Sequence, residues 1–207
     1  MDTIAFAIFL ASVGAISLTG VVMPGPVFAA TVVKGVQNKH AGGWISIGHI
    51  LIEVPLIVLM ASGLYYIFSD YYVRAAIGVV GGALLIYMGV RMYIIRKKSE
   101  VIEQAFPMHP ILAGLITTAT NPYFIVWWAT IGASIIIIAL GFGALGVVAL
   151  ALVHESCDVG WYYFVGYASH SSRKLWTGRT QAFVFGTFGV ILALFGIYFM
   201  MAFWITG

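Results

Sequence analysis

Residues 4–33 read IAFAIFLASVGAISLTGVVMPGPVFAATVV, a run without a single charged side chain. About 20 apolar residues in helical conformation are enough to cross the hydrocarbon core of a bilayer. The run is therefore predicted to be a transmembrane helix. Pro24-Gly25-Pro26 lies inside it, and because proline lacks an N–H and blocks the preceding turn, the helix is predicted to break there.

The composition of the whole chain also indicates a membrane protein. Of its 207 residues, 62% are hydrophobic and 8% are charged, and the mean hydropathy is +1.03. Too little polar surface remains to cover a water-soluble globule. The single cysteine, Cys157, excludes an internal disulfide framework. The net charge is +3, but the basic residues are spread over short loops, so no nucleic acid partner is predicted.

Five further apolar runs follow, at residues 44–68, 73–95, 110–140, 143–169 and 180–205. The predicted fold class is an all-α integral membrane protein with six transmembrane helices. The longest linker, residues 96–109, is charged and precedes Pro110, as expected of a solvated loop. It divides a single membrane domain into residues 1–95 and residues 110–207, each with three spans.

Basic residues fall on one side of this predicted topology. The first, third and fifth loops carry nine of the ten, namely Lys34, Lys39, Arg91, Arg96, Lys97, Lys98, Arg173, Lys174 and Arg179. The other side carries Arg74. Because positively charged loops stay in the cytoplasm, these three loops, including the linker 96–109, are predicted to be cytoplasmic. Both termini are then outside, in a multi-pass protein of the cell membrane.

An odd number of spans in each half makes the second half inverted relative to the first. Asn121-Pro122 interrupts span four, the counterpart of span one. His49 and Glu53 in span two are four residues apart, and so are His154 and Asp158 in span five. We predict two inverted three-helix repeats with broken helices in spans one and four. In secondary transporters such broken helices form the substrate site near the bilayer midplane.

Each predicted break offers polar groups to a ligand. A proline leaves the carbonyl four residues earlier without its helical partner, here at Gly20, Val22 and Thr118. The half-helix that starts after each break has free N–H groups, and two such starts suit a carboxylate. Thr118 and Asn121 beside the second break are predicted to bind substrate. The alternative is that both breaks are packing kinks.

Three acids lie deep in the predicted spans: Glu53, Glu155 and Asp158. No Lys or Arg lies in a span interior to pair with them, and such acids usually face a cavity or a proton relay. His49 and His154 are the available partners. We predict that His49, Glu53, His154 and Asp158 bind substrate, and that Glu53, Glu155, Asp158 and His154 couple transport to protons. The alternative is that the histidine–acid pairs only hold helices together.

These elements resemble the lysine exporter (LysE) superfamily, which includes the threonine and homoserine exporters. The resemblance is carried by Met23-Pro24-Gly25-Pro26, Gly43 to His49, Thr120-Asn121-Pro122 and the region from His154 to Asp158. It implies an inner-membrane exporter of amino acids, dimeric and working with proton coupling or antiport. It also implies that Pro24, Gly25, Pro26, Asn121 and Pro122 belong to the site.

The leading hypothesis is a secondary transporter that exports small, cationic or zwitterionic amino acids by proton-coupled alternating access. The alternative is a divalent metal-ion exporter, in which His49, Glu53, His154 and Asp158 supply two nitrogens and two carboxylates. An enzyme is not expected, because no zinc-protease motif, nucleophile elbow or nucleotide fingerprint is present. No cofactor is predicted, and the predicted partners are an amino acid, membrane lipid and a second copy of the chain. Trp127 and Trp128 are interpreted as interfacial anchors or packing residues.

Overall fold

The computed structural model describes residues 2–63, 70–97, 108–175 and 177–206. All of its regular elements are helical, and six helices within these ranges are long and apolar enough to cross a membrane. They are Thr3–Val21, Ala41–Ala61, Tyr71–Ile94, Tyr123–Leu140, Gly143–Ser171 and Gly178–Tyr198. The predicted all-α class with six membrane spans is therefore confirmed. Residues 64–68 of the second predicted span and 98–107 of the linker lie outside the described residues.

The described residues of the first half form four helices: α1 (Thr3–Val21), α2 (Pro26–Gln37), α3 (Ala41–Ala61) and α4 (Tyr71–Ile95). Two of them start at an aspartate whose side chain accepts from backbone N–H groups of the first turn. Asp2 caps α1 and Asp70 caps α4 in this way. Pro26 occupies the first turn of α2, where its missing N–H costs no helical hydrogen bond.

The second half contains α6 (Pro110–Ala119), α7 (Pro122–Trp127), the π-helical turn η2 (Trp128–Gly132), α8 (Ala133–Leu140), α9 (Gly143–Ser171), the 3₁₀ turn η3 (Arg173–Leu175) and α10 (Gly178–Thr206). The segments α7, η2 and α8 follow one another without an intervening loop. A positive φ of 69° at Gly143, which glycine adopts without strain, separates α8 from α9.

Helical structure stops between α1 and α2 and again between α6 and α7. The prediction that Gly20 and Thr118 keep unpaired carbonyl groups is wrong. The Gly20 oxygen accepts from the Met23 N–H at 3.3 Å, and the Thr118 oxygen accepts from the Asn121 N–H at 3.0 Å. The chain tightens into a turn before each proline, so the carbonyl finds a donor three residues ahead instead of four.

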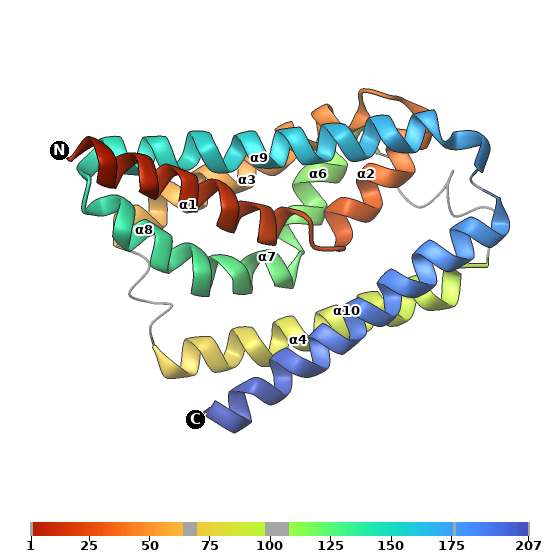
Figure 1. Cartoon of the computed structure of the whole chain (residues 1–207). Coiled ribbons are helices and arrows are strands. Elements are labelled where there is room, and N and C mark those ends of the chain that lie inside the picture. The colour runs from red at the N-terminus through yellow and green to blue at the C-terminus, as the bar shows by residue number, and fades with distance from the viewer. Residues whose placement is uncertain (1, 64–69, 98–107, 176, 207) are drawn as a thin grey trace.

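Helix α9 runs the length of one group of helices and contacts α1, α2, α3 and α8 (Figure 1). Helix α3 packs on α9 and also on α6. At Gly48 an added Cβ atom would lie 2.0 Å from the Ile111 oxygen, and at Gly114 it would lie 2.2 Å from the Ile45 oxygen. The absence of side chains therefore lets α3 and α6 approach backbone to backbone, which brings His49 beside Thr118.

Helices α4 and α10 pack along each other at the side of this group (Figure 1). Phe28 of α2 meets Phe188 of α10 edge to face, with ring centroids 4.9 Å apart. The ends of α2 and α4 and the link from α9 to α10 lie at one end of the bundle, opposite the start of α1 (Figure 1). The inverted repeat, its division at residues 96–109 and the membrane orientation stay predictions.

Candidate functional site

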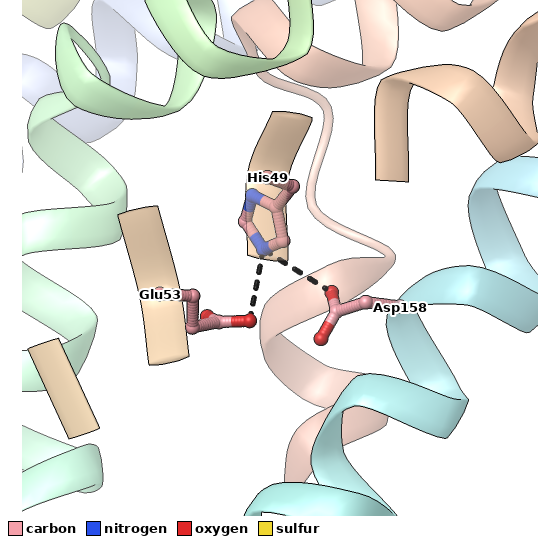
Figure 2. A group of neighbouring side chains, drawn as sticks. All are labelled: His49, Glu53 and Asp158. Carbon is pink, nitrogen blue, oxygen red and sulfur yellow. Dashed lines mark ion pairs between the residues drawn. The ribbon is translucent and has the colours of Figure 1, made fainter. Parts of the chain in front are cut away.

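Two histidines and two acids from α3 and α9 converge inside the bundle. The His49 Nε2 atom lies 3.1 Å from Oε2 of Glu53 and 3.7 Å from Oδ1 of Asp158, as Figure 2 shows. The His154 Nε2 atom lies 3.2 Å from Oε1 of Glu53 and 3.3 Å from Oδ2 of Asp158. All four residues are buried. Each imidazole therefore contacts the acid of its own helix and the acid of the other helix.

Two hydroxyl groups hold the far side of the imidazole rings. Thr118 Oγ1 lies 2.7 Å from Nδ1 of His49, and Ser17 Oγ lies 2.7 Å from Nδ1 of His154. The Ser17 hydroxyl donates its own hydrogen to the Val13 carbonyl at 2.7 Å. The contact with His154 therefore requires an N–H on Nδ1, since a hydroxyl has one hydrogen to donate. This fixes the ring so that Nε2 faces the two carboxyl groups.

Ser17 was missed by the sequence analysis. It lies on α1, just as Thr118 lies on α6, so each histidine is held by a hydroxyl from the other half of the chain. The available signal was the predicted repeat. If a hydroxyl of span four pairs with His49, the predicted repeat places a hydroxyl of span one beside His154.

Trp128 was interpreted as an anchor or packing residue, but it also makes a polar contact in the site. Its indole N–H donates to Oε1 of Glu53 at 2.8 Å, and the residue is 1% exposed. It begins the π-helical turn η2, and Gly132 ends that turn. An added Cβ atom at Gly132 would lie 2.3 Å from the Trp128 ring, so the ring needs a glycine there. Hydropathy alone carries no signal for a π turn.

A cavity of about 40 Å³ adjoins this cluster. That is room for about three waters or a bound ion. Its lining comes from both halves and includes Gly20, Val21, His49, Glu53, Asn121, Tyr123, Phe124, Trp127, Trp128, His154, Asp158 and Tyr162.

The residues predicted at the two breaks are placed differently. Asn121 lines the cavity, and its amide nitrogen would lie 3.6 Å from a Cβ atom at Gly25, so the two breaks are neighbours. Pro24, Gly25 and Pro26 are absent from the described cavity lining. Thr118 acts through His49, and Pro122 begins α7.

Glu155, predicted to take part in proton coupling, is half-buried. Both of its carboxyl oxygens are covered and accept no hydrogen bond from the described residues. It does not line the cavity within the described part of the chain. With Glu155, Glu53 and Asp158, this region holds three carboxyl groups but two imidazoles. Within the described ranges no lysine or arginine forms an ion pair with these acids.

The arrangement suits protons or a cation. Ligand atoms of His49, Glu53 and Asp158 all lie within 4.8 Å of one another, close enough to share a metal ion. Nitrogen and carboxylate oxygen together are typical ligands of divalent transition metals. The same carboxyl groups are acceptors for an ammonium group or for protons on the imidazoles.

Six apolar helices around buried ionisable groups are typical of a multi-pass membrane transport protein. The family model of the LysE type translocator matches residues 18–202, and the chain belongs to this family. The resemblance noted in the sequence is thereby confirmed, and the chain is a membrane translocator of the exporter kind. Neither the curated proteins nor the solved structures contain a match.

Proposed function

We propose that the protein exports small amino acids, cationic or zwitterionic, across the cell membrane by proton-coupled alternating access. The observation that carries this proposal is the buried cluster in which Glu53 and Asp158 face each other across α3 and α9, where the ion-pair partners among the described residues are imidazoles. An ionised carboxyl group in a membrane interior is costly without a positive partner. An ammonium group of a substrate supplies such a partner.

Coupling to protons follows from shared acceptors. When Nε2 of His154 carries a hydrogen, this imidazole is positively charged, because its Nδ1 already bears one. An arriving ammonium group competes with this imidazolium group for the same two carboxyl groups. Binding of substrate then favours loss of protons, and proton return favours release of substrate.

Alternating access accounts for the small cavity. About 40 Å³ is too little for an amino acid, so the site has to widen to hold one in the proposed cycle. Both halves contribute to the cluster, and rocking one half against the other would widen it towards one side of the membrane at a time. The basic loops are proposed to face the cytoplasm. In export, the substrate then enters from the side of these loops and is released on the opposite side.

The test is efflux of labelled lysine, arginine and threonine from proteoliposomes containing the purified protein. Stimulated efflux that Glu53→Gln abolishes supports the proposal. Asp70→Asn is the matched control, because it removes a carboxyl group whose described hydrogen bonds are the cap of α4. Absence of stimulated efflux for every amino acid would contradict the proposal.

A divalent metal ion is the second candidate substrate. It is favoured by the 4.8 Å cluster of His49, Glu53 and Asp158 and by the hydroxyl that holds Nδ1 of His49. A second partner of this kind is usual for histidines that ligate metals. Titration with Mn²⁺ or Zn²⁺, followed by tryptophan fluorescence in the presence and absence of excess lysine, distinguishes the two. Metal-dependent quenching that excess lysine leaves unchanged favours the metal.

A further inference from the structure

One lining residue of the cavity has a buried donor that the cluster does not use. Trp127 is 5% exposed, and its indole N–H finds no hydrogen-bond acceptor among the described residues. Buried polar groups in folded proteins are nearly always paired, so an unpaired donor beside a cavity needs an explanation. The neighbouring Trp128 is paired, since its N–H donates to Glu53.

The position of the Trp127 N–H is set by α1 and α9. An added Cβ atom at Gly20 would lie 3.0 Å from the indole nitrogen, so the N–H lies against the end of α1. The Trp127 ring lies over His154, with centroids 5.3 Å apart and planes tilted by 31°. Gly20, Trp127 and His154 all line the same cavity. The donor therefore belongs to the wall next to the first break.

The acid cluster offers the opposite kind of group. Oε2 of Glu53 and Oδ2 of Asp158 accept no hydrogen bond from the described residues, although each lies within ion-pair distance of a histidine. The cavity thus combines the unused Trp127 donor with two carboxyl oxygens that accept no described hydrogen bond. A ligand that complements it carries a donor or cation at one end and an acceptor or anion at the other. A bare metal ion or a proton has no acceptor to offer.

The helix starts are weaker candidates for the anionic end than the sequence suggested. Pro26 and Pro122 occupy the first positions of α2 and α7, and proline has no N–H. The Tyr123 N–H is already taken by the Asn121 side chain at 3.1 Å. The Trp127 indole, by contrast, is a buried and uncommitted donor of a cavity-lining side chain.

We propose that the Trp127 indole N–H binds the carboxylate of the transported amino acid, while Glu53 and Asp158 receive its ammonium group. This inference rests on the proposed function and adds the feature that distinguishes an amino acid from the corresponding amine. The substrate must present a carboxylate, so lysine is bound in preference to cadaverine, which has two ammonium groups and no acceptor.

The experiment compares lysine and cadaverine in proteoliposomes. The KM for labelled lysine efflux and the inhibition constant of cadaverine are measured for the wild type and for Trp127→Phe. Phenylalanine keeps an aromatic ring at the site and removes the donor. Since hydrogen bonds to charged groups have a net strength of about 1.5–3 kcal/mol, the KM for lysine is expected to rise by about tenfold to a hundredfold. The inhibition constant of cadaverine is expected to stay within about twofold.

Trp161→Phe is the matched control. Its indole N–H is also buried without a described hydrogen-bond partner, but Trp161 does not line the described cavity. Loss of this N–H is expected to leave both constants unchanged. A second test variant is Gly20→Ala, in which the added methyl group would lie 2.9 Å from the Trp127 ring and displace it. It is expected to show the same selective loss for lysine.

Two outcomes would overturn the inference while the proposed function stands. One is a wild type that exports lysine and a Trp127→Phe variant with an unchanged KM. The other is an equal loss for lysine and cadaverine, which indicates general damage to packing. A wild type that exports no amino acid would instead overturn the proposed function. Thermal unfolding of each variant, measured in the same detergent, verifies that it is folded.

Discussion

Glu53 of α3 lies 101 residues before His154 of α9, yet Oε1 of the glutamate is 3.2 Å from Nε2 of the histidine. The same oxygen accepts the Trp128 N–H at 2.8 Å. The other carboxyl oxygen of Glu53 lies 3.1 Å from His49. Glu53 is therefore the group on which α3, α9 and η2 converge.

This convergence predicts an order of effects for the two acids. Asp158 contacts the two histidines and, unlike Glu53, receives no described indole N–H. Glu53→Gln is expected to lower the initial rate of lysine efflux by at least about tenfold, as expected for loss of a charged partner. Asp158→Asn is expected to lower it less. Equal stability of the two variants in thermal unfolding is the required control, and a larger loss in Asp158→Asn would contradict the prediction.

The hydroxyl of Ser17 predicts a stability effect. In Ser17→Ala the Nδ1–H of His154 loses its acceptor in a buried position, and an unsatisfied buried donor costs about 1–3 kcal/mol. The unfolding temperature in detergent is expected to fall, and Ser17→Thr is expected to restore much of it because it keeps the hydroxyl. Ser12→Ala removes a hydroxyl from the exposed side of the same helix and serves as the control. An equal change in Ser12→Ala and Ser17→Ala would show that the contact with His154 contributes nothing.

The membrane spans and their helical class were predictable from the sequence because hydropathy and length act locally. A run such as residues 4–33 has few alternatives to a spanning helix. The acids were also recognisable, since an unpaired glutamate in an apolar run stands out. Their cross-helix partners were not, because spacing by four explains only contacts within one helix. That Glu53 contacts His154 depends on how α3 packs against α9.

The roles of Ser17 and Trp128 were hidden for different reasons. A serine in a membrane helix usually bonds to the carbonyl four residues earlier, as Ser17 does with Val13, so its second contact leaves no trace in the pattern. A tryptophan in an apolar span is typical of an interfacial anchor or of a packing residue. Trp128 begins the π turn η2 and its indole N–H donates to Glu53, and hydropathy indicates neither feature. The carbonyl groups at Gly20 and Thr118 were mispredicted because a tight turn satisfies them locally.

The distribution of basic residues predicts the membrane orientation. A reporter that functions only outside the cytoplasm is expected to be active when it is fused after the C-terminus, and a reporter that functions only in the cytoplasm is expected to be inactive there. A cysteine introduced at exposed Leu175, between α9 and α10, is expected to be labelled by an impermeant reagent only after the membrane is opened. Cys157 is first replaced by alanine so that the new thiol is the single one. Labelling of the Leu175 position in intact cells would reverse the orientation.

The π turn predicts that Gly132 and Trp128 act on the site as a unit. A methyl group at Gly132 would lie 2.3 Å from the Trp128 ring and push the indole away from Glu53. Trp128→Phe removes the same hydrogen bond, adds no clash and keeps an aromatic ring at the position. Each variant is expected to raise the KM for lysine by about tenfold, the effect of losing one hydrogen bond to a charged group.

Because both substitutions remove the same contact, the KM of the double variant is expected to be no higher than that of the more impaired single variant. Gly160→Ala is the control for a glycine in a helix, since an added Cβ atom there meets nothing within 4 Å. It is expected to keep the wild-type KM. If the effects of Gly132→Ala and Trp128→Phe multiply in the double variant, the two residues act independently, and the π turn does not serve to hold the indole on Glu53.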